Sequence, residues 1–165
     1  PVSAHVTDTA SLIRALDAGV DDIAHSVIDR VSDTQITRMI DGNVSWIPTQ
    51  AIQEGMGAGN LRRFANAGGR IALGNDAGFL AGVLVGMPTH EIEAMADAGF
   101  TPMEIILAST RDAACVCRLD HLLGTIEAGK LADLLVVRGD PLKDLGALED
   151  VVVVVHGGEI IRFEE

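Results

Sequence analysis

Residues 1–26, PVSAHVTDTASLIRALDAGVDDIAHS, hold a strand, a helix and a second strand in a short stretch of chain. Val2 to His5 is short and apolar, and Asp22 to His25 repeats that pattern. Between them, residues 8–18 place leucine and isoleucine at helical spacing, and Gly19 follows where a helix ends in the left-handed conformation. This order predicts two parallel strands whose crossover is the helix.

The same rhythm continues as far as residue 73. Ser32 to Gln35 has the form of a capping box and predicts the start of a second helix. Val44 to Ile47 reads as a third strand that Pro48 stops, and a helix over residues 60–67 leads to a fourth strand at residues 71–73. The predicted fold class is therefore α/β with a parallel sheet and helical crossovers.

A strong helix start follows at Thr101-Pro102-Met103-Glu104, with Thr101 as N-cap and Pro102 in the first helical position. From Ile106 to Cys117 the apolar residues form one stripe at helical spacing, which predicts one continuous helix.

Beyond residue 120 the pattern is purely that of strands. They are expected at residues 134–137, 151–155 and 159–163, with a hairpin turn at Gly157-Gly158, because glycine takes a positive φ without strain. We place a boundary near residues 118–124. Residues 1–120 then form a parallel β/α domain, and residues 121–165 belong to a small antiparallel one.

Composition excludes several classes of protein. Of the 165 residues 48% are hydrophobic, enough for a real core. With 12 Lys and Arg against 24 Asp and Glu, the net charge of −12 argues against a nucleic-acid partner. The apolar run Val151 to Val155 is far too short to cross a membrane, and no basic, apolar leader opens the chain. Cys115 and Cys117 are too close for an ordinary disulfide, so we expect a reducing, cytoplasmic location.

Three side chains suited to a metal ion stand at predicted strand ends. His5 ends the first strand, His25 ends the second, and Asp76 follows the fourth in Gly74-Asn75-Asp76-Ala77-Gly78. Taken singly, each is an ordinary polar strand end. Because the carboxyl ends of parallel strands meet on one face, together they predict a site for a divalent metal such as zinc.

Other signals are weaker. Gly55 to Asn60 resembles a phosphate-binding loop but lacks the third glycine of that fingerprint. Cys115 and Cys117 are expected in the core, and no nucleophile-elbow motif surrounds Ser26. His90 opens a helix after the Asp76 loop, where it either contacts substrate over the same face or is an ordinary surface residue.

Several motifs in succession resemble the second half of a metal-dependent amidohydrolase, most closely the imidazolonepropionase-like and prolidase-like branches. In chain order these motifs are Ser3-Ala4-His5, Ile23-Ala24-His25-Ser26, Ile47-Pro48-Thr49, Leu73-Gly74-Asn75-Asp76-Ala77-Gly78, Thr101-Pro102, Ala108-Ser109-Thr110-Arg111-Asp112-Ala113-Ala114, Gly124-Thr125-Ile126-Glu127-Ala128-Gly129-Lys130-Leu131-Ala132-Asp133-Leu134 and Gly139-Asp140-Pro141-Leu142.

The resemblance implies a (β/α)₈ TIM-type barrel, of which this chain supplies strands five to eight. The tail would be part of a small antiparallel β-sandwich domain. It also implies that His5 and His25 bind metal or contact substrate, and that Asp76 binds metal and shuttles a proton. One or two metal ions, zinc above all, would serve the parent enzyme in hydrolysing C–N bonds of small-molecule or peptide-like amides.

The family's H-x-H motif and its metal-bridging lysine have no counterpart in this sequence, and Asn75 replaces the Thr or Ser common before the aspartate. The chain also has no initiating Met, so we expect a piece of a longer protein, with metal weak or absent in this chain alone. The alternative function is a non-catalytic half-barrel module that pairs with a missing N-terminal half or with another copy of itself, since open sheet edges invite pairing.

Overall fold

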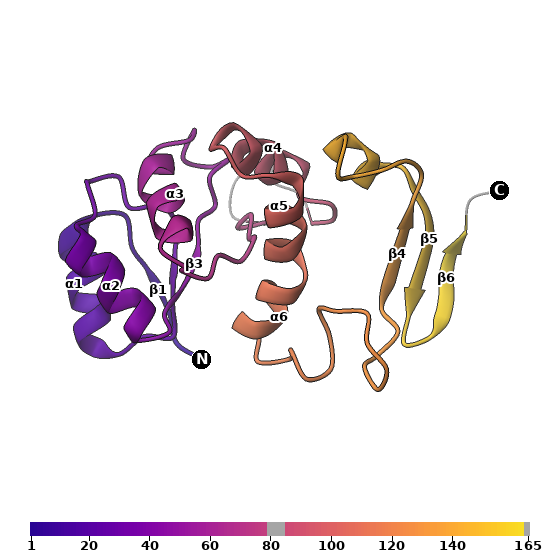
Figure 1. Ribbon diagram of the computed structural model, residues 1–165, viewed down its shortest axis with the longest axis horizontal. Helices are drawn as coiled ribbons and strands as arrows, with labels where there is room; N and C mark the ends of the chain where they lie inside the picture. Colours follow the sequence, from indigo (N-terminus) through magenta and orange to yellow (C-terminus); the bar gives the residue numbers. More distant parts are fainter. Residues whose placement is uncertain (79–84, 164–165) are drawn as a thin grey trace.

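The structure is a computed structural model that describes residues 1–78 and 85–163 (Figure 1). In chain order its elements are β1 (Ser3–His5), α1 (Thr9–Ala18), β2 (Asp22–Ala24), α2 (Asp33–Asp41), β3 (Ser45–Ile47), α3 (Ala58–Asn66), α4 (Thr89–Asp97), α5 (Pro102–Ser109), α6 (Arg111–Val116), β4 (Leu134–Val137), the 3₁₀ helix η1 (Leu145–Glu149), β5 (Val151–His156) and β6 (Glu159–Phe163).

The first three strands form the predicted parallel sheet in the order β1-β2-β3. His5 pairs with Ala24, and Ala24 pairs in turn with Ile47, so the carboxyl ends of the three strands are level. Helices α1 and α2 are the crossovers between them. The prediction of an α/β fold with a parallel sheet is thus confirmed for this part of the chain.

The fourth strand is shorter than predicted. Of residues 71–73, only Ile71 bridges to the sheet, opposite Trp46. The reason is a change of hydrogen-bond partner: the Ala72 N–H donates to Trp46 at 3.0 Å, but the Leu73 N–H donates to the carbonyl of Ala108 near the end of α5. Leu73 therefore leaves the ladder.

Helix starts follow the sequence closely. Ser32 accepts from the backbone of Gln35 while the Gln35 side chain accepts from the backbone of Ser32, and Thr101 and Glu104 make the same reciprocal pair. Gly19 ends α1 with φ of 74°, as its position predicted. Each box satisfies backbone N–H groups that the first helical turn leaves without partners.

The single helix predicted through residue 117 is wrong, because the chain breaks at Thr110 into α5 and α6. Ser109 and Thr110 both turn their hydroxyls back onto carbonyls four residues earlier, at 2.7 and 2.6 Å, a bond that competes with regular helix geometry. The buried residues of α5 are Ile105 and Ala108, outside the predicted stripe.

The core lies around the parallel sheet and its helices. Its largest fully buried side chains include Trp46, Phe64, Leu12, Ile23, Met39 and Leu61. Trp46 and Phe64 meet edge to face, with ring centroids 5.5 Å apart.

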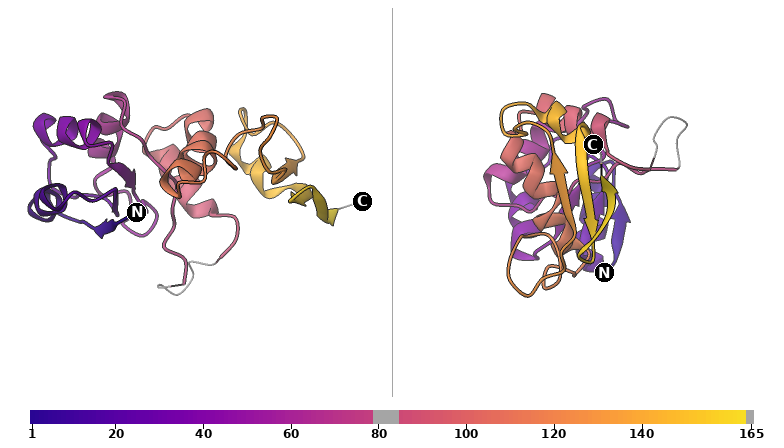
Figure 2. Two further views of the ribbon diagram at one scale, coloured as in Figure 1. Left: turned by 90° about the horizontal axis from the view of Figure 1, so that it is seen from below. Right: turned by 90° about the vertical axis from the view of Figure 1, so that its right-hand side faces the viewer.

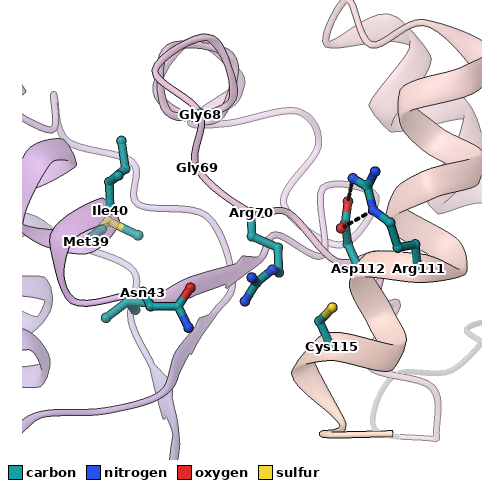
Figure 3. A pocket seen from close by; sticks show the side chains of 10 residues that line it. Met39, Ile40, Asn43, Gly68, Gly69, Arg70, Arg111, Asp112 and Cys115 are labelled. Carbon is teal, nitrogen blue, oxygen red and sulfur yellow. Dashed lines mark hydrogen bonds and ion pairs between the residues drawn. The ribbon is translucent and has the colours of Figure 1, made fainter. Parts of the chain in front are cut away.

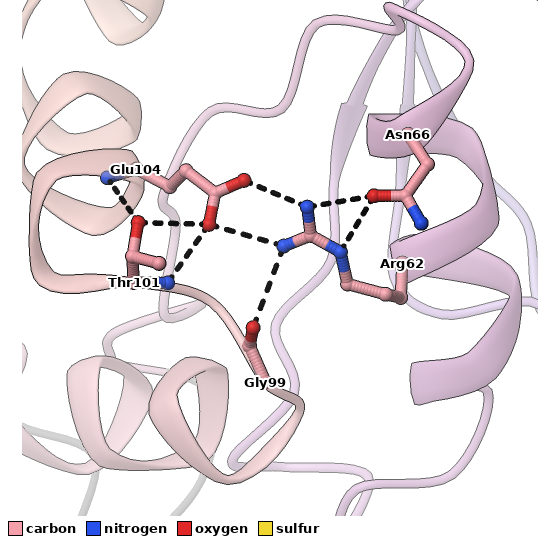
Figure 4. A network of polar contacts seen from close by, with 5 residues as sticks. All are labelled: Arg62, Asn66, Gly99, Thr101 and Glu104. Atoms are coloured by element: carbon pink, nitrogen blue, oxygen red, sulfur yellow. Dashed lines mark hydrogen bonds and ion pairs between the residues drawn. The ribbon is translucent and has the colours of Figure 1, made fainter.

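A polar network ties α3 to α5 (Figure 4). Two nitrogens of the Arg62 guanidinium donate to the two carboxylate oxygens of Glu104, at 2.7 and 3.1 Å. Arg62 also donates to Asn66 and lies over the ring of Phe100, 4.6 Å from its centroid. The arginine and the N–H and hydroxyl of Thr101 hold the pKa of Glu104 down at about 2.

The C-terminal strands form a second, antiparallel sheet in the order β4-β5-β6, as predicted. Gly157 and Gly158 take φ of 58° and 87° in the turn between β5 and β6. Helices α4 to α6 lie between the two sheets in Figure 1 and in the left view of Figure 2. The half-barrel, the β-sandwich and the domain division at residue 120 stay predictions.

Within the two described ranges, no helix has the length and apolar character needed to cross a bilayer.

Candidate functional site

His5 and His25 lie in contact at the carboxyl end of the parallel sheet. His5 is the last residue of β1 and pairs with Ala24, the last residue of β2. His25 follows Ala24 directly and therefore lies beside His5. The two rings meet edge to face at 67°, with their centroids 4.4 Å apart. The predicted convergence of these two histidines therefore matches the geometry.

Three further bonds fix His25. Its Nδ1 lies 2.8 Å from the hydroxyl oxygen of Thr49, its backbone N–H donates to Ile47, and its carbonyl accepts from the indole N–H of Trp46 at 2.7 Å. Thr49 and Trp46 are both buried. With Nδ1 engaged by Thr49, Nε2 is the ring nitrogen left for a ligand or a proton.

The electrostatic surroundings favour a neutral His25. Burial lowers its pKa, the neighbouring His5 lowers it further, and Asp76 opposes both by raising it. Asp76, which follows the Ile71 bridge along the chain, is thus the acidic residue that influences His25 electrostatically. A neutral imidazole has a free lone pair, the form that binds metal ions or accepts protons.

Three residues of the candidate site and its support have strained backbone, as do Asn43, Glu54 and Arg118 elsewhere in the chain. His25, Thr49 and Asp76 have φ of 72°, 46° and 53°, in the left-handed region that side-chain-bearing residues rarely adopt. Each follows a different parallel strand or bridge. Such residues persist only where the surroundings hold them, and they are common at functional sites.

The donor types suit zinc, because imidazole nitrogen and carboxylate oxygen are its usual ligands. Among residues 1–78 and 85–163, however, no group of three or more His, Cys, Asp and Glu side chains is arranged to hold a metal ion. The two histidines in contact thus fall short of a closed metal site among the described residues. The metal-binding roles of His5, His25 and Asp76 stay predictions.

The family model that describes the amidohydrolase family matches residues 1–161, nearly the whole chain. The chain belongs to the amidohydrolase family. The resemblance seen in its motifs is thereby confirmed.

Among characterised relatives, this amidohydrolase chain is 36% identical over 109 residues to the imidazolonepropionase of Geobacillus kaustophilus strain HTA426. That alignment covers 65% of the chain and 26% of the relative. The fold of the present chain is similar to the crystal structure of an Xaa-Pro dipeptidase with bound methionine in the active site, with a TM-score of 0.83 and 27% identity. A putative prolidase from Bifidobacterium longum gives a TM-score of 0.81 and 28% identity.

The chain spans less than half of these solved structures. The match with the dipeptidase includes 98% of this chain but 44% of the dipeptidase chain. The match with the prolidase includes 97% of this chain but 46% of the prolidase chain.

Glu91 and Thr49 belong to the surroundings of the candidate site, but the sequence predicted no role for either. Glu91 is 1% exposed, and its carboxylate oxygens accept the backbone N–H groups of Gln50 and Ala51, both at 2.8 Å. Burial raises the pKa of Glu91 to about 7, although the two N–H bonds favour the charged form. The signal was an acidic residue four positions before the buried Met95, on the apolar side of α4.

His90 lies on the exposed side of α4, within 3.5 Å of Glu93. It borders a cavity of about 480 Å³ that is also lined by the loop after β3, including Gln50 and Glu54. A substrate contact by His90 stays a prediction.

A second cavity, of about 330 Å³, lies at the other end of the parallel sheet (Figure 3). Asn43 and Arg70, which precede β3 and the Ile71 bridge, line it together with Cys115 of α6. It is therefore remote from the strand ends that carry the histidines. Cys115 is half-buried and Cys117 is exposed, so the expectation that both cysteines lie in the core is wrong.

The glycine-rich stretch from Gly55 to Asn60 has a structural role. The buried Asn60 side chain donates to the carbonyls of Val27 and Asp29 and accepts from the N–H of Val31. It therefore ties the loop after β2 to α3.

Proposed function

We propose that this chain supplies one half of the active site of a hydrolase that cleaves C–N bonds in amide, cyclic amide or peptide-like substrates. The contact of His5 with His25 at the carboxyl ends of β1 and β2 carries the proposal. The electrostatic influence of Asp76 on His25 supports it. Membership of the amidohydrolase family supports hydrolysis as the reaction type. The similarity to an imidazolonepropionase and an Xaa-Pro dipeptidase supports the substrate class.

In this proposal Asp76 moves the proton. Its exposed carboxylate takes a proton from the attacking water as a general base and returns it to the leaving nitrogen as a general acid. His25, kept neutral by burial and by His5, presents Nε2 to a metal ion or to the carbonyl oxygen of the substrate. His90 contacts the part of the substrate that reaches the cavity beside α4.

A divalent metal, zinc first, would polarise the scissile carbonyl and lower the pKa of the attacking water. His5, His25 and Asp76 are the residues of this chain that would hold it. Because the described residues do not bring three such side chains into a metal-holding group, the metal is held weakly or not at all until further ligands join the site.

A second candidate function follows from the edge of the sheet. Within the described residues β1 is paired only with β2, so its outer edge is open. Open edges template pairing with another strand. The alternative is a non-catalytic module that pairs through β1 with a separate N-terminal half or with a second copy of this chain.

The deciding experiment is a hydrolysis screen of Xaa-Pro dipeptides, cyclic amides and ureas, with added Zn²⁺, Mn²⁺ or Co²⁺. It is run on the isolated chain and on the chain co-expressed with the polypeptide encoded directly upstream of Pro1. The proposal predicts weak or no turnover by the isolated chain and metal-dependent turnover by the co-expressed pair. Absence of turnover in both preparations, with a stable complex formed through β1, would establish the non-catalytic alternative.

A further inference from the structure

Glu91 clamps the loop that follows β3. It lies in the first turn of α4 and is almost fully buried, and its carboxylate accepts the N–H groups of Gln50 and Ala51 at 2.8 Å each. Leaving a buried carboxylate without hydrogen bonds is costly, so both bonds matter for keeping this side chain inside. The clamp therefore fixes the two peptide groups that come directly after Thr49.

Thr49 carries this constraint to the site. Its φ of 46° is strained for a β-branched residue, so the backbone on either side must hold it. Its hydroxyl oxygen lies 2.8 Å from Nδ1 of His25 and is the side-chain partner of that nitrogen among the described residues. A shift of the Gln50 peptide would move the hydroxyl with it.

The same loop also holds the residue that follows His25. The Gln50 side chain donates to the hydroxyl of Ser26, which donates to the carbonyl of Pro48 at 3.1 Å. The Ser26 N–H donates to the side chain of Gln53 at 3.0 Å. The loops after β2 and β3 thus form one buried polar network, with the Glu91 carboxylate at its end.

We propose that Glu91 is a positioning residue for His25: by clamping the Gln50 and Ala51 peptides it holds the Thr49 hydroxyl on Nδ1 and thereby presents Nε2 at the strand ends. The consequence for catalysis rests on the proposed function, but the positioning itself does not. The carboxylate of Glu91 in α4 thus fixes the orientation of the ring of His25, which follows β2.

The test reads the tautomers of His25 by ¹⁵N NMR of its ring at pH 8, without substrate or metal. In Glu91→Gln, an amide donor replaces one of the two acceptors, so the Gln50 and Ala51 amide protons move upfield. The ratio of the two neutral His25 tautomers should change about fivefold or more, the size of effect one hydrogen bond can exert. Thr49→Val, which removes the hydroxyl directly, should change the ratio in the same direction.

Glu93→Gln, on the exposed side of the same helix, is the matched control and should leave the His25 signals in place. A Glu91→Gln protein with shifted Gln50 and Ala51 amides but an unchanged His25 ratio would overturn the proposal. If Glu91→Gln does not fold, Glu91→Asp, which keeps the charge but withdraws it by one methylene, takes its place with the same two outcomes. Because no turnover is measured, failure of the hydrolysis proposal leaves this result intact.

Discussion

The rings of His5 and His25 touch edge to face with their centroids 4.4 Å apart, although 19 residues of strand, helix and turn separate them in the chain. The register of β1 on β2, with His5 opposite Ala24, makes this contact unavoidable once the parallel sheet forms. The pairing of two strands thus creates the centre of the candidate site.

The strained backbone at His25 predicts an unusual ranking of substitutions. With φ of 72°, His25→Asn should be tolerated better than His25→Val, because asparagine visits the left-handed region and β-branched residues do not. We expect His25→Val to have a free energy of unfolding about 1–2 kcal/mol below that of His25→Asn, measured by urea denaturation. At His5, which lies in the extended strand β1, the same two substitutions should rank the other way, with valine favoured.

A glycine pair gives an equally direct test of the loop between β3 and α3. Gly57 has φ of 78°, and a Cβ there would lie 2.6 Å from the carbonyl oxygen of Val27. Gly57→Ala should therefore lower the free energy of unfolding by about 2 kcal/mol or more. Two residues on, in α3, a Cβ on Gly59 meets nothing within 4 Å, so Gly59→Ala should raise it by about 0.5–1 kcal/mol. Equal effects of the two variants in thermal or urea unfolding would contradict the loop geometry.

Glu91 should give the fold a distinctive pH dependence. Its folded-state pKa of about 7 lies above the ordinary value of 4.5, so the folded protein binds this proton more tightly than the unfolded chain does. The resulting stabilisation is full below about pH 4.5 and is lost as the pH rises to about 7. Relative to Glu91→Gln, the wild type should lose up to about 3 kcal/mol of unfolding free energy between pH 4.5 and 8. A difference that stays constant over this range would show that the carboxyl titrates normally.

Glu104 should act in the opposite sense. Its pKa of about 2 lies below the ordinary value, so its stabilisation is present above about pH 4.5 and is lost as the pH falls toward 2. Because the pair with Arg62 is partly exposed, we expect Glu104→Gln to cost only about 1 kcal/mol at pH 7, and nothing at pH 2. Asp17→Asn, which breaks the more exposed pair with Arg38, is the control and should cost less than about 0.5 kcal/mol. Urea denaturation of both variants and the wild type at pH 7 and pH 2 measures these differences. A cost of Glu104→Gln that is the same at the two pH values would contradict the prediction.

Local signals predicted much of the fold. Capping residues such as Ser32 and Thr101, and the turn at Gly157-Gly158, act through bonds within a few residues, so the sequence reveals them. The early end of the fourth strand depends on Leu73 finding Ala108, 35 residues away, and no local pattern shows that partner. The break at Thr110 also arises from hydroxyl groups that an apolar stripe does not register.

The candidate site was predictable in its strand-end residues and hidden in its supports. His5 and His25 stand out because strand ends of a parallel sheet share one edge, and their contact was predicted, whereas the role of Asp76 stays a prediction. Thr49 acts from the loop after β3, and Glu91 acts from α4, which begins 40 residues after Thr49. Their roles therefore appear only in three dimensions. An acidic residue on a buried helix face remains the one sequence feature that could have drawn attention to Glu91.

In the proposed hydrolysis of C–N bonds, Asp76, which influences His25 electrostatically, moves the proton. The most direct measurement is kcat/KM for the best substrate from the screen, in the chain completed by its upstream polypeptide, for wild type, Asp76→Asn and Asp41→Asn. Asp41 ends α2 on the surface, so its exchange is the matched control. We expect a fall of about 10³-fold for Asp76→Asn and of less than about twofold for Asp41→Asn. If Asp76→Asn retains wild-type kcat/KM, Asp76 is not the proton carrier and the proposed site is wrong.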